Sequence, residues 1–214
     1  MKTGHRELLA TALALTLLLA GCTASDSTPP QPWNGRVQTH GALRSIFHEG
    51  QTGAMVSLDS VLPNPNLYAL GALPDLAGEV TVIAGQVYLA LSQDDTTEHT
   101  ETATESNAGA TLLVSAEVPS WQSTVTKDPI NFEALDQAIA QLAADAGMDL
   151  DSRFPFLLEG TFNNLEWHVI DGSRLADGGT SHQDHLAASV HLKQKRAAAT
   201  LIGFYSNHDQ GVFT

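Results

Sequence analysis

One carboxylate stands out among the residues whose types and spacing could support chemistry. Glu79 follows Gly78 at the mouth of an otherwise uncharged segment, residues 80–83, whose Val and Ile content favours a β-strand. A buried unpaired charge is costly, so the Glu79 carboxylate must be solvated, paired or bound to another group. A solvated glutamate at a strand end is the simpler interpretation, and a carboxylate that serves a site is the alternative.

Three histidines form a second candidate group. His182, His185 and His191 are spaced as His-x-x-His-x5-His, and a loop with this spacing could wrap around a zinc ion. No cysteine or carboxylate frame accompanies them, and most histidines of this kind are surface or loop residues. Metal binding by this group therefore stays an open alternative to a solvated loop.

The elements that must position these residues are mostly strands. Turn residues and runs of β-branched and aromatic residues delimit them. They are a hairpin over 79–91 with its turn at Ala84-Gly85-Gln86, and strands over 111–118, 154–172 and 199–205. The acidic segment 92–109 has few apolar residues, which favours a surface loop.

One helix is clearly indicated. Asn131 can cap its start, Gly147 stops it, and apolar residues recur between them at helical spacing. These residues are Phe132, Leu135, Ile139, Leu142 and Ala146. The pattern predicts a helix that covers a sheet with one apolar face, and a packing role rather than a catalytic one.

Two segments echo one another in a way that predicts a duplicated half-domain. Glycines and apolar residues of 71–85 recur at matched positions in 160–172, with a two-residue deletion near the end. Both copies place an ionisable residue at the same point, Glu79 in the first and His168 in the second. Chance similarity is the alternative, because apolar alternation and flanking glycines recur in all β-rich proteins.

The N-terminus carries an export signal rather than part of the fold. Lys2 and Arg6 form a basic start, an apolar run too short to span a bilayer follows, and Leu19-Ala20-Gly21 precedes the only cysteine, Cys22. This arrangement resembles a bacterial lipobox, which implies cleavage before Cys22 and lipid attachment to it. The expected parts are a signal peptide (1–21), a lipidated cysteine with a flexible tether (22–36) and one domain (37–214).

The charge of the chain argues against several partners. The formal net charge of −14 becomes −15 when the signal peptide is removed, which disfavours nucleic acid and anionic lipid surfaces. Attachment to the bacterial cell envelope is therefore expected through acyl chains, not through a basic face. The mature part, of about 190 residues, is large enough for one domain with a single core or for two small, closely packed halves. It has no second cysteine for a disulfide.

Four segments together resemble bacterial α-acetolactate decarboxylases, particularly a shorter, exported variety. They are LYALGALPDLAGEVTVIAGQVYLAL (67–91), ATLLVSAEVPSW (110–121), FPFLLEGTFNNLEWHVIDG (154–172) and ATLIGFYSNHDQGVFT (199–214). The resemblance implies an α+β fold of two related β-rich halves, with mixed and antiparallel sheets and one covering helix. It also implies an enzyme that is often a homodimer, with a zinc ion held by three histidines.

The reaction implied by the resemblance converts 2-acetolactate, a 2-hydroxy-3-oxo acid, to acetoin and carbon dioxide. Loss of carbon dioxide leaves an enediolate, whose charge a Lewis acid stabilises before a general acid delivers one proton. The family's Leu-Asp-Gly-Glu block matches residues 76–79, so Glu79 is expected to be an acid/base or site-ordering carboxylate. The family's arginine block falls near His168, where this chain has no arginine, so His168 or Arg174 is expected to take its role toward the substrate carboxylate.

The zinc ligands implied by the resemblance lie beyond Thr214, in a His-x-His pair and a third histidine that this sequence does not contain. The chain is therefore expected to be incomplete at its C-terminus, with strands missing and no metal ligand assigned. Two function classes remain open. One is a lipid-anchored acetolactate decarboxylase, and the other is a non-catalytic envelope lipoprotein that uses the same core as a binding or structural module.

Overall fold

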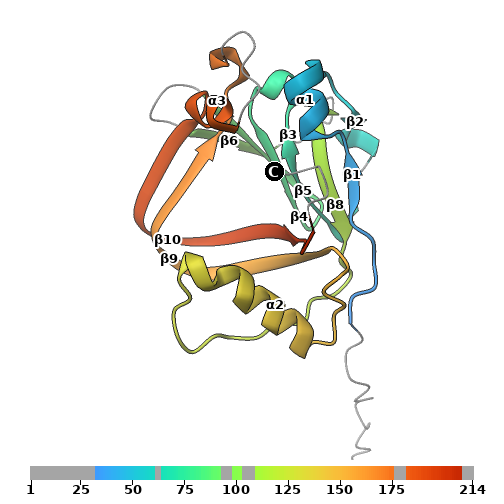
Figure 1. Cartoon of the computed structure of the whole chain (residues 1–214), viewed down its shortest axis with the longest axis vertical. Helices are drawn as coiled ribbons and strands as arrows, with labels where there is room; N and C mark the ends of the chain where they lie inside the picture. Colours follow the sequence, from blue (N-terminus) through green and yellow to red (C-terminus); the bar gives the residue numbers. More distant parts are fainter. Residues whose placement is uncertain (1–31, 61–63, 93–97, 103–108, 176–181, 209–214) are drawn as a thin grey trace, which may run out of the picture. The chain divides into compact units, whose positions relative to one another are not determined.

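A six-stranded antiparallel sheet is the main element of the computed structural model, which describes residues 32–60, 64–92, 98–102, 109–175 and 182–208. Its strand order is β1-β8-β3-β4-β5-β6 (Figure 1). The strands are β1 (Gln38–His40), β3 (Leu67–Ala72), β4 (Glu79–Ile83), β5 (Gln86–Ser92), β6 (Glu98–Thr102) and β8 (Leu112–Glu117). A separate short pair joins β2 (Val56–Ser57) to β7 (Gly109–Ala110).

The hairpin predicted from the glycines and β-branched residues is confirmed as β4 and β5. Ile83 pairs with Gln86, so Ala84 and Gly85 are the two central residues of the turn. Both have positive φ, 51° and 77°, which is the backbone that matches the right-handed twist of the flanking strands. The turn therefore closes the hairpin in the register that buries Val80 and Val82 on one face.

The second sheet is a long two-stranded ribbon formed by β9 (Phe154–Val169) and β10 (Val190–Tyr205). The antiparallel pairing is interrupted at Asn164 and Lys195, where Asn164 has a φ of 54°. Figure 1 shows that the ribbon bends into two arms. The two ends of β9 therefore contact different elements: Phe154 packs against α2 (Leu135–Asp145), and Ile170, just after Val169, bonds to Glu79 of β4.

Two of the four buried clusters among the described residues lie against the main sheet, one on each of its faces. On one face, residues of β3, β4, β5 and β8 pack with Leu58 of the short helix η1 (Leu58–Ser60). On the other face, Tyr68, Val114 and Ala116 pack against side chains of the ribbon that include Leu157 and Ile202. The ribbon covers this second face, and β8 is buried along both faces for most of its length, whereas β4 is fully buried on one face only.

The predicted helix is confirmed as η3 (Phe132–Ala134) followed by α2 (Leu135–Asp145). The Asn131 side chain accepts a hydrogen bond from the Ala134 N–H at 2.9 Å, and Gly147, with a φ of 77°, follows the helix end. Ile139 and Ala143 are buried against Phe154 of the ribbon. Two residues of the predicted apolar face are wrong, because Phe132 (91% exposed) and Leu142 (38% exposed) are not packed in the core.

Two segments expected to be loops contain regular structure. The acidic segment 92–109 contributes β6, which pairs with β5 from Tyr88↔Thr102 to Ser92↔Glu98. The histidine-bearing segment contains the helix α3 (His182–Ala187), and β10 begins at Val190, well before the expected start at residue 199. Alternating charged residues such as Lys193 and Lys195 hide this strand from a hydropathy pattern, because one face of the ribbon is solvated.

The fold class is α+β, as predicted, with antiparallel sheets and one long helix among the described residues. The two segments of the expected repeat lie in different settings. Glu79 begins a strand of the main sheet, whereas His168 is the second-last residue of β9. None of the helices in the described ranges has the length and apolarity needed to cross a bilayer.

Candidate functional site

The turn that delivers Glu79 to the sheet has an unusual backbone. In η2 (Pro74–Leu76), Asp75 and Leu76 have positive φ, 56° and 53°, which is rare for residues other than glycine. Thr52 supports the turn twice: its carbonyl accepts from the Asp75 N–H at 2.8 Å, and its hydroxyl donates to Asp75 Oδ1 at 2.9 Å. Strained backbone of this kind costs of order 1–3 kcal/mol and is often retained where a side chain must be aimed at a site.

Gly78 completes the approach to Glu79. Its φ is 145°, and a Cβ at this position would lie 2.2 Å from the carbonyl oxygen of Ala90. No other residue fits without moving a backbone strand. The chain therefore enters β4 directly at Glu79, which pairs with Ala72 on one side and Ala90 on the other.

The Glu79 carboxylate reaches the ribbon. Its Oε1 atom accepts a hydrogen bond of 3.3 Å from the backbone N–H of Ile170, which directly follows β9. Glu79 is half-buried and has a defined hydrogen-bond partner, so it is not simply a solvated strand-end residue, and its service to a site stays a prediction. This bond joins the main sheet to the segment that carries His168 and Arg174.

A second turn, η4 (Gly172–Arg174), follows Ile170 and is organised by Asp171. Asp171 Oδ1 accepts from the Ser173 N–H at 3.1 Å and from the Ser173 hydroxyl at 2.6 Å. Its other oxygen, Oδ2, lies 2.9 Å from Nε of Arg174, in an ion pair whose side chains are 17% and 33% exposed. Asp171 thus holds the Arg174 guanidinium through its Nε atom. Arg174 follows Ile170, the residue that bonds to Glu79, by four positions.

The two turns interlock. A Cβ on Gly172 would lie 2.1 Å from the carbonyl oxygen of Asp75, so the backbones of η4 and η2 touch. Ile170 and Leu175 pack on a buried cluster that contains Leu76. Because Glu79 follows one turn and Arg174 ends the other, this junction fixes the two candidate residues in the same part of the fold.

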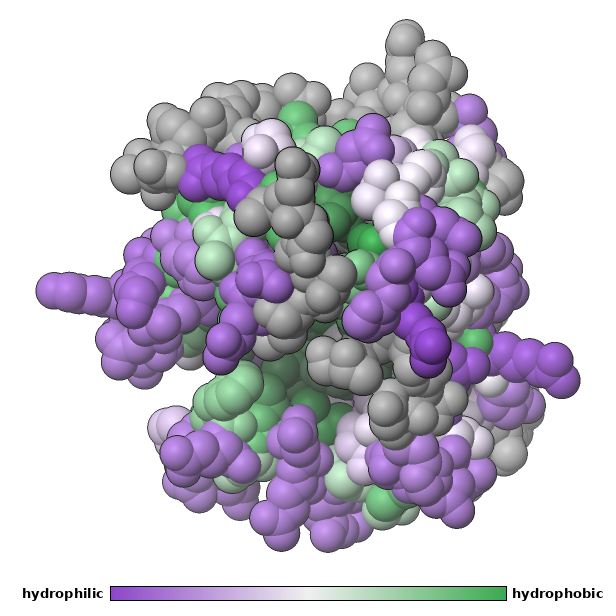
Figure 2. All heavy atoms as spheres, turned by 45° about the horizontal axis from the view of Figure 1, so that its top comes forward, coloured by the Kyte–Doolittle hydropathy of each residue, from purple (hydrophilic) through white to green (hydrophobic). Residues whose placement is uncertain are grey.

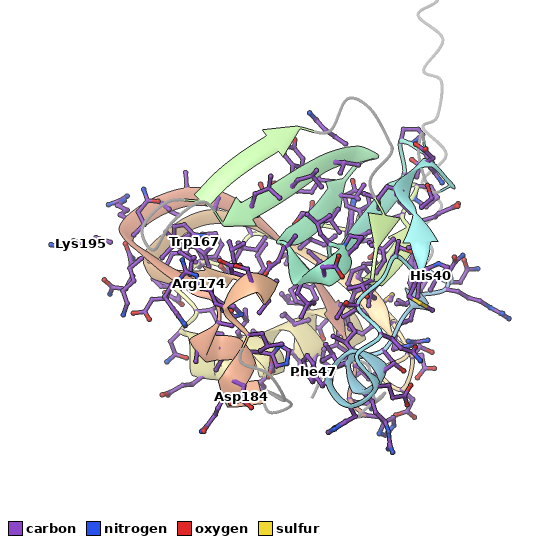
Figure 3. The ribbon with its side chains drawn as sticks, turned by 90° about the horizontal axis from the view of Figure 1, so that it is seen from above. His40, Phe47, Trp167, Arg174, Asp184 and Lys195 are labelled. Carbon is purple, nitrogen blue, oxygen red and sulfur yellow. The ribbon has the colours of Figure 1, made fainter. Side chains whose placement is uncertain are left out.

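His168 lies on the exposed face of the ribbon. It pairs across the strands with His191, and their ring centroids are 5.9 Å apart at an interplanar angle of 35°. Trp167, its neighbour, lies on the opposite face, which is less exposed because side chains alternate along a strand. In Figure 3, Trp167 and Arg174 lie in the same part of the fold, whereas Lys195 extends away from the ribbon.

Two histidines of the predicted cluster, His185 and His191, lie in a helix and in a strand rather than in a loop. His185 is buried on α3, and its ring centroid lies 3.7 Å from that of Phe47 on α1 (Leu43–Glu49). Nε2 of His191 lies 2.9 Å from the carbonyl oxygen of Leu186, so Nε2 carries the proton that this bond requires. The premise of a zinc-wrapping loop is therefore wrong, and the side chain of His182 lies outside the described residues.

Among the described residues, no three His, Cys, Asp or Glu side chains come together as a metal site would require. Several predictions concern residues outside the described ranges: the signal peptide, the lipidation site Cys22 and most of the tether.

Asp171 and Ser173 were missed in the sequence, although Asp followed two residues later by Ser is a recognisable turn signal. The Ile170 N–H had no such signal, because it is a backbone group.

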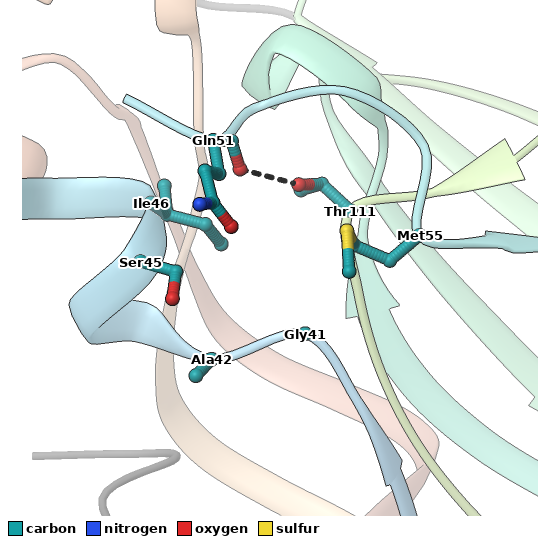
Figure 4. Close-up of a pocket in the computed structure, with 7 residues that line it drawn as sticks. All are labelled: Gly41, Ala42, Ser45, Ile46, Gln51, Met55 and Thr111. Carbon is teal, nitrogen blue, oxygen red and sulfur yellow. Dashed lines mark hydrogen bonds between the residues drawn. The ribbon is translucent and has the colours of Figure 1, made fainter. Parts of the chain in front are cut away.

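A separate hollow of about 210 Å³ lies between α1 and the loop that follows it (Figure 4). Its lining residues are Gly41, Ala42, Ser45, Ile46, Gln51, Met55 and Thr111. The Thr111 hydroxyl donates to the Gln51 carbonyl at 3.2 Å, and none of the lining side chains is ionisable. The hollow therefore lacks acid/base groups, and Glu79 with Arg174 is the better candidate for a reaction site.

Comparison with solved structures identifies the architecture. A Staphylococcus aureus protein of unknown function, described as similar to alpha-acetolactate decarboxylase, matches with a TM-score of 0.62 and 15% identity, over 82% of this chain and 70% of its own. The alpha-acetolactate decarboxylase of Bacillus subtilis strain 168 matches with a TM-score of 0.58 and 11% identity, over 83% of this chain and 70% of its own.

The acetolactate decarboxylase of Bacillus subtilis subspecies spizizenii matches with a TM-score of 0.62 and 12% identity, over 83% of this chain and 71% of its own. No protein-family model and no curated protein sequence matches the chain. At these identities the likeness shows a shared fold. The predicted fold family is therefore confirmed at the level of architecture.

Proposed function

We propose that the protein is an acetolactate decarboxylase, which converts 2-acetolactate to acetoin and carbon dioxide. The observation that carries this proposal is the Glu79 carboxylate, which is bonded to Ile170 N–H where η2 and η4 touch, and η4 ends in Arg174. A decarboxylase of a small keto acid needs a cation for the substrate carboxylate and a group that delivers one proton. The shared fold with the two Bacillus enzymes adds support.

Arg174 is assigned to the substrate carboxylate. Asp171 holds Nε of its guanidinium at 2.9 Å, and guanidinium groups bind carboxylates through paired N–H donors. His168, exposed at the end of β9, is the second group assigned to catalysis because it occupies the family's arginine region. Both residues belong to the segment that is bonded to Glu79 through Ile170.

Glu79 is assigned to proton transfer. When the bond between C2 and the carboxylate of acetolactate breaks, its electron pair forms the C2–C3 double bond and places negative charge on the C3 oxygen. Carbon dioxide leaves, and a proton held by the Glu79 carboxyl group moves to C2, which produces acetoin. Glu79 then regains a proton from water, so one proton is consumed for each carbon dioxide released.

Zinc is implied by the resemblance as a Lewis acid that stabilises the developing negative charge. The described residues do not fit such an ion, because no group of three ligating side chains is found among them. Steps are therefore assigned only to the protein groups named above. The second candidate is a non-catalytic envelope lipoprotein with this core as a binding or structural module.

One assay separates the two candidates. Protein made from the complete reading frame that encodes this chain is incubated with 2-acetolactate, with and without added zinc, and acetoin is measured against spontaneous decarboxylation. The decarboxylase proposal predicts acetoin release well above the spontaneous rate. Folded protein that releases none in either condition, and that retains no zinc on dialysis, would identify the non-catalytic module instead.

The proposal also includes a lipid anchor at Cys22 and a location at the bacterial cell envelope. It rests on the Leu19-Ala20-Gly21-Cys22 segment and the apolar run before it. Expression in a bacterium should give a protein that lacks residues 1–21 and whose N-terminal peptide carries the mass of attached acyl chains. The Cys22→Ser variant should keep the unprocessed mass and lose the acyl groups, and an acyl-free wild-type protein would contradict the anchor.

A further inference from the structure

Exposed apolar side chains gather in one stretch of the chain. Among the described residues, five large apolar side chains are exposed, and four of them lie between residues 125 and 142. They are Val125 (91% exposed), Ile130 (41%), Phe132 (91%) and Leu142 (38%). Single exposed apolar residues are ordinary on protein surfaces, whereas several in one segment make that segment a candidate interaction surface.

The exposure of Phe132 is built into the fold. The residue opens η3 directly after Asn131, whose side chain caps the turn through the Ala134 N–H at 2.9 Å. The helix that follows is held by Ile139 and Ala143, which are buried against the ribbon. In this orientation of the helix, the Phe132 side chain is exposed to water. It does not share the buried face that Ile139 and Ala143 form.

The described chain begins beside the same helix. Pro32 Cγ lies 3.3 Å from the position that a Cβ on Gly147 would take, just past the end of α2. Trp33 packs in the same cluster as Ile139 and Ala143, and its indole N–H donates to the Glu117 carbonyl at 2.9 Å. Figure 1 shows the start of the described chain, α2 and the segment leading into α2 at one end of the fold.

The distance to the proposed anchor is short. Ten positions separate Cys22 from Pro32, and an extended chain of that length reaches at most about 36 Å. An α-helix of eleven residues, such as α2, is about 16 Å long. A bilayer that holds the acyl chains of Cys22 therefore lies within reach of α2 and of the exposed apolar residues before it.

We propose that the surface formed by residues 122–134 and the exposed side of α2 rests on the phospholipid bilayer, with Val125, Ile130 and Phe132 inserted at the boundary between headgroups and acyl chains. The proposal rests on the lipid anchor proposed above. Charge does not drive the contact, because Asp128, Glu133 and Asp136 outnumber the single Lys127 here. The insertion is apolar, so it should favour zwitterionic lipid and persist in high salt.

This contact would orient the candidate site away from the bilayer. β9 begins with Phe154, which packs on α2, and ends sixteen residues later at Val169, next to the Ile170 group that bonds to Glu79. The acyl chains alone would leave the domain free to tumble on its tether. Insertion of the three side chains keeps α2 at the bilayer surface. Glu79 and Arg174 then lie near the far end of β9, away from α2.

The test uses the chain from Cys22 onward, with the Cys22 thiol coupled chemically to a maleimide phospholipid in phosphatidylcholine vesicles, so it does not depend on natural lipidation. Tryptophan is introduced as Phe132→Trp or, as a matched control, Met55→Trp, because Met55 is 54% exposed and lies outside the surface. Brominated phosphatidylcholine quenches tryptophan emission at the depth of the acyl chains.

The emission added by Phe132→Trp should be quenched at least twofold more than that added by Met55→Trp, equally in low and high salt. Equal quenching at the two positions would overturn the proposal, whatever the outcome of the acetoin assay. A second measurement is sedimentation equilibrium without lipid. Self-association that disappears in the Phe132→Ser variant, whose thermal unfolding should match wild type, would assign the surface to a second copy of the chain and likewise overturn it.

Discussion

Glu79 and Ile170 are 91 positions apart in the sequence, and the backbone N–H of Ile170 donates a 3.3 Å hydrogen bond to the Glu79 carboxylate. The bond links the first residue of β4 to the residue after β9. It also brings the turn that carries Arg174 against the turn that precedes Glu79. The candidate site is therefore a product of two turns from distant parts of the chain, each shaped by a glycine that touches backbone.

The Glu79→Gln variant should separate proton transfer from structure. The introduced side chain can still accept the Ile170 N–H through its amide oxygen, so the free energy of unfolding should change by less than about 1 kcal/mol. An amide cannot deliver a proton as a carboxyl group does, and the rate of acetoin formation should fall by about 10²-fold or more. Glu133→Gln, at an exposed position of η3, is the control and should leave the rate unchanged. A Glu79→Gln enzyme with wild-type rate would remove Glu79 from the mechanism.

The Gly172→Ala variant should report the contact between the two turns. The added Cβ would lie 2.1 Å from the Asp75 carbonyl oxygen, so one backbone must move. We expect a loss of about 2–3 kcal/mol in the free energy of unfolding, measured by urea denaturation. Gly160→Ala is the matched control, because nothing lies within 4 Å of a Cβ at that position of β9. Equal stability of the two variants would mean that η2 and η4 do not touch as described.

The Asp171→Asn variant should act on substrate binding through Arg174. The amide oxygen of the new side chain can still accept from Ser173, but the ion pair with Arg174 Nε, 2.9 Å long, is lost. The guanidinium is then free to leave its position, and KM for acetolactate should rise about fivefold to tenfold with a smaller change in kcat. Asp149→Asn is the control, since Asp149 caps a similar turn through Asp151 and Ser152, with no arginine partner among the described residues. Equal KM values in the two variants would exclude a positioning role for Asp171.

Asp149 also predicts a pH dependence of stability. The Asp151 N–H and the Ser152 hydroxyl donate to its carboxylate and hold the pKa of Asp149 below its usual value. Because the pKa is lower in the folded protein, this contribution is present above the unfolded pKa, about 3.9, and is lost as the pH falls through the folded pKa. Urea unfolding of wild type and Asp149→Asn at about pH 6 and about pH 3 should show a stability difference that shrinks in acid. A difference that grows in acid would contradict the sign of the shift.

The parts of the fold that were predicted correctly depend on local signals. The β4–β5 turn needs two residues with positive φ, and Ala84-Gly85 supplies the glycine. The limits of the long helix follow from the Asn131 cap and the Gly147 stop. Each signal lies within a few residues of the feature that it determines, so a single sequence is enough to read it.

The parts that were missed depend on partners that are distant in the chain or on exposure. β6 forms from an acidic segment because it adds to the open edge of β5, and an edge strand needs little apolar content. β10 starts early because it pairs with β9 from Val190 to Tyr205, with one interruption at Lys195. The charged residues Lys193, Lys195 and Arg196 make that segment resemble a polar loop. His185 is buried by Phe47, a contact that no spacing within its own segment could indicate.

One residue of the candidate site, Glu79, could be predicted from the sequence, whereas its hydrogen-bond partner could not. Glu79 was identified because a lone carboxylate beside a glycine at a strand start is unusual, and the structure gives it a defined partner. That partner is a backbone N–H, which every residue except proline has, so composition cannot reveal it. The strained turn at Asp75 and Leu76 was also hidden, because its tertiary contacts, among them those with Thr52 and Gly172, are distant in the chain.

The long separation between η2 and η4 has a consequence for the order of folding. The ribosome makes the Asp75–Leu76 turn long before Gly172, so the left-handed backbone of that turn has no support from η4 while the first half of the chain emerges. Contacts of such high sequence separation form late because closing the intervening loop is entropically costly. Glu79 can therefore reach its working position only after β9 has been made and docked, and a nascent chain carries the carboxylate without the site.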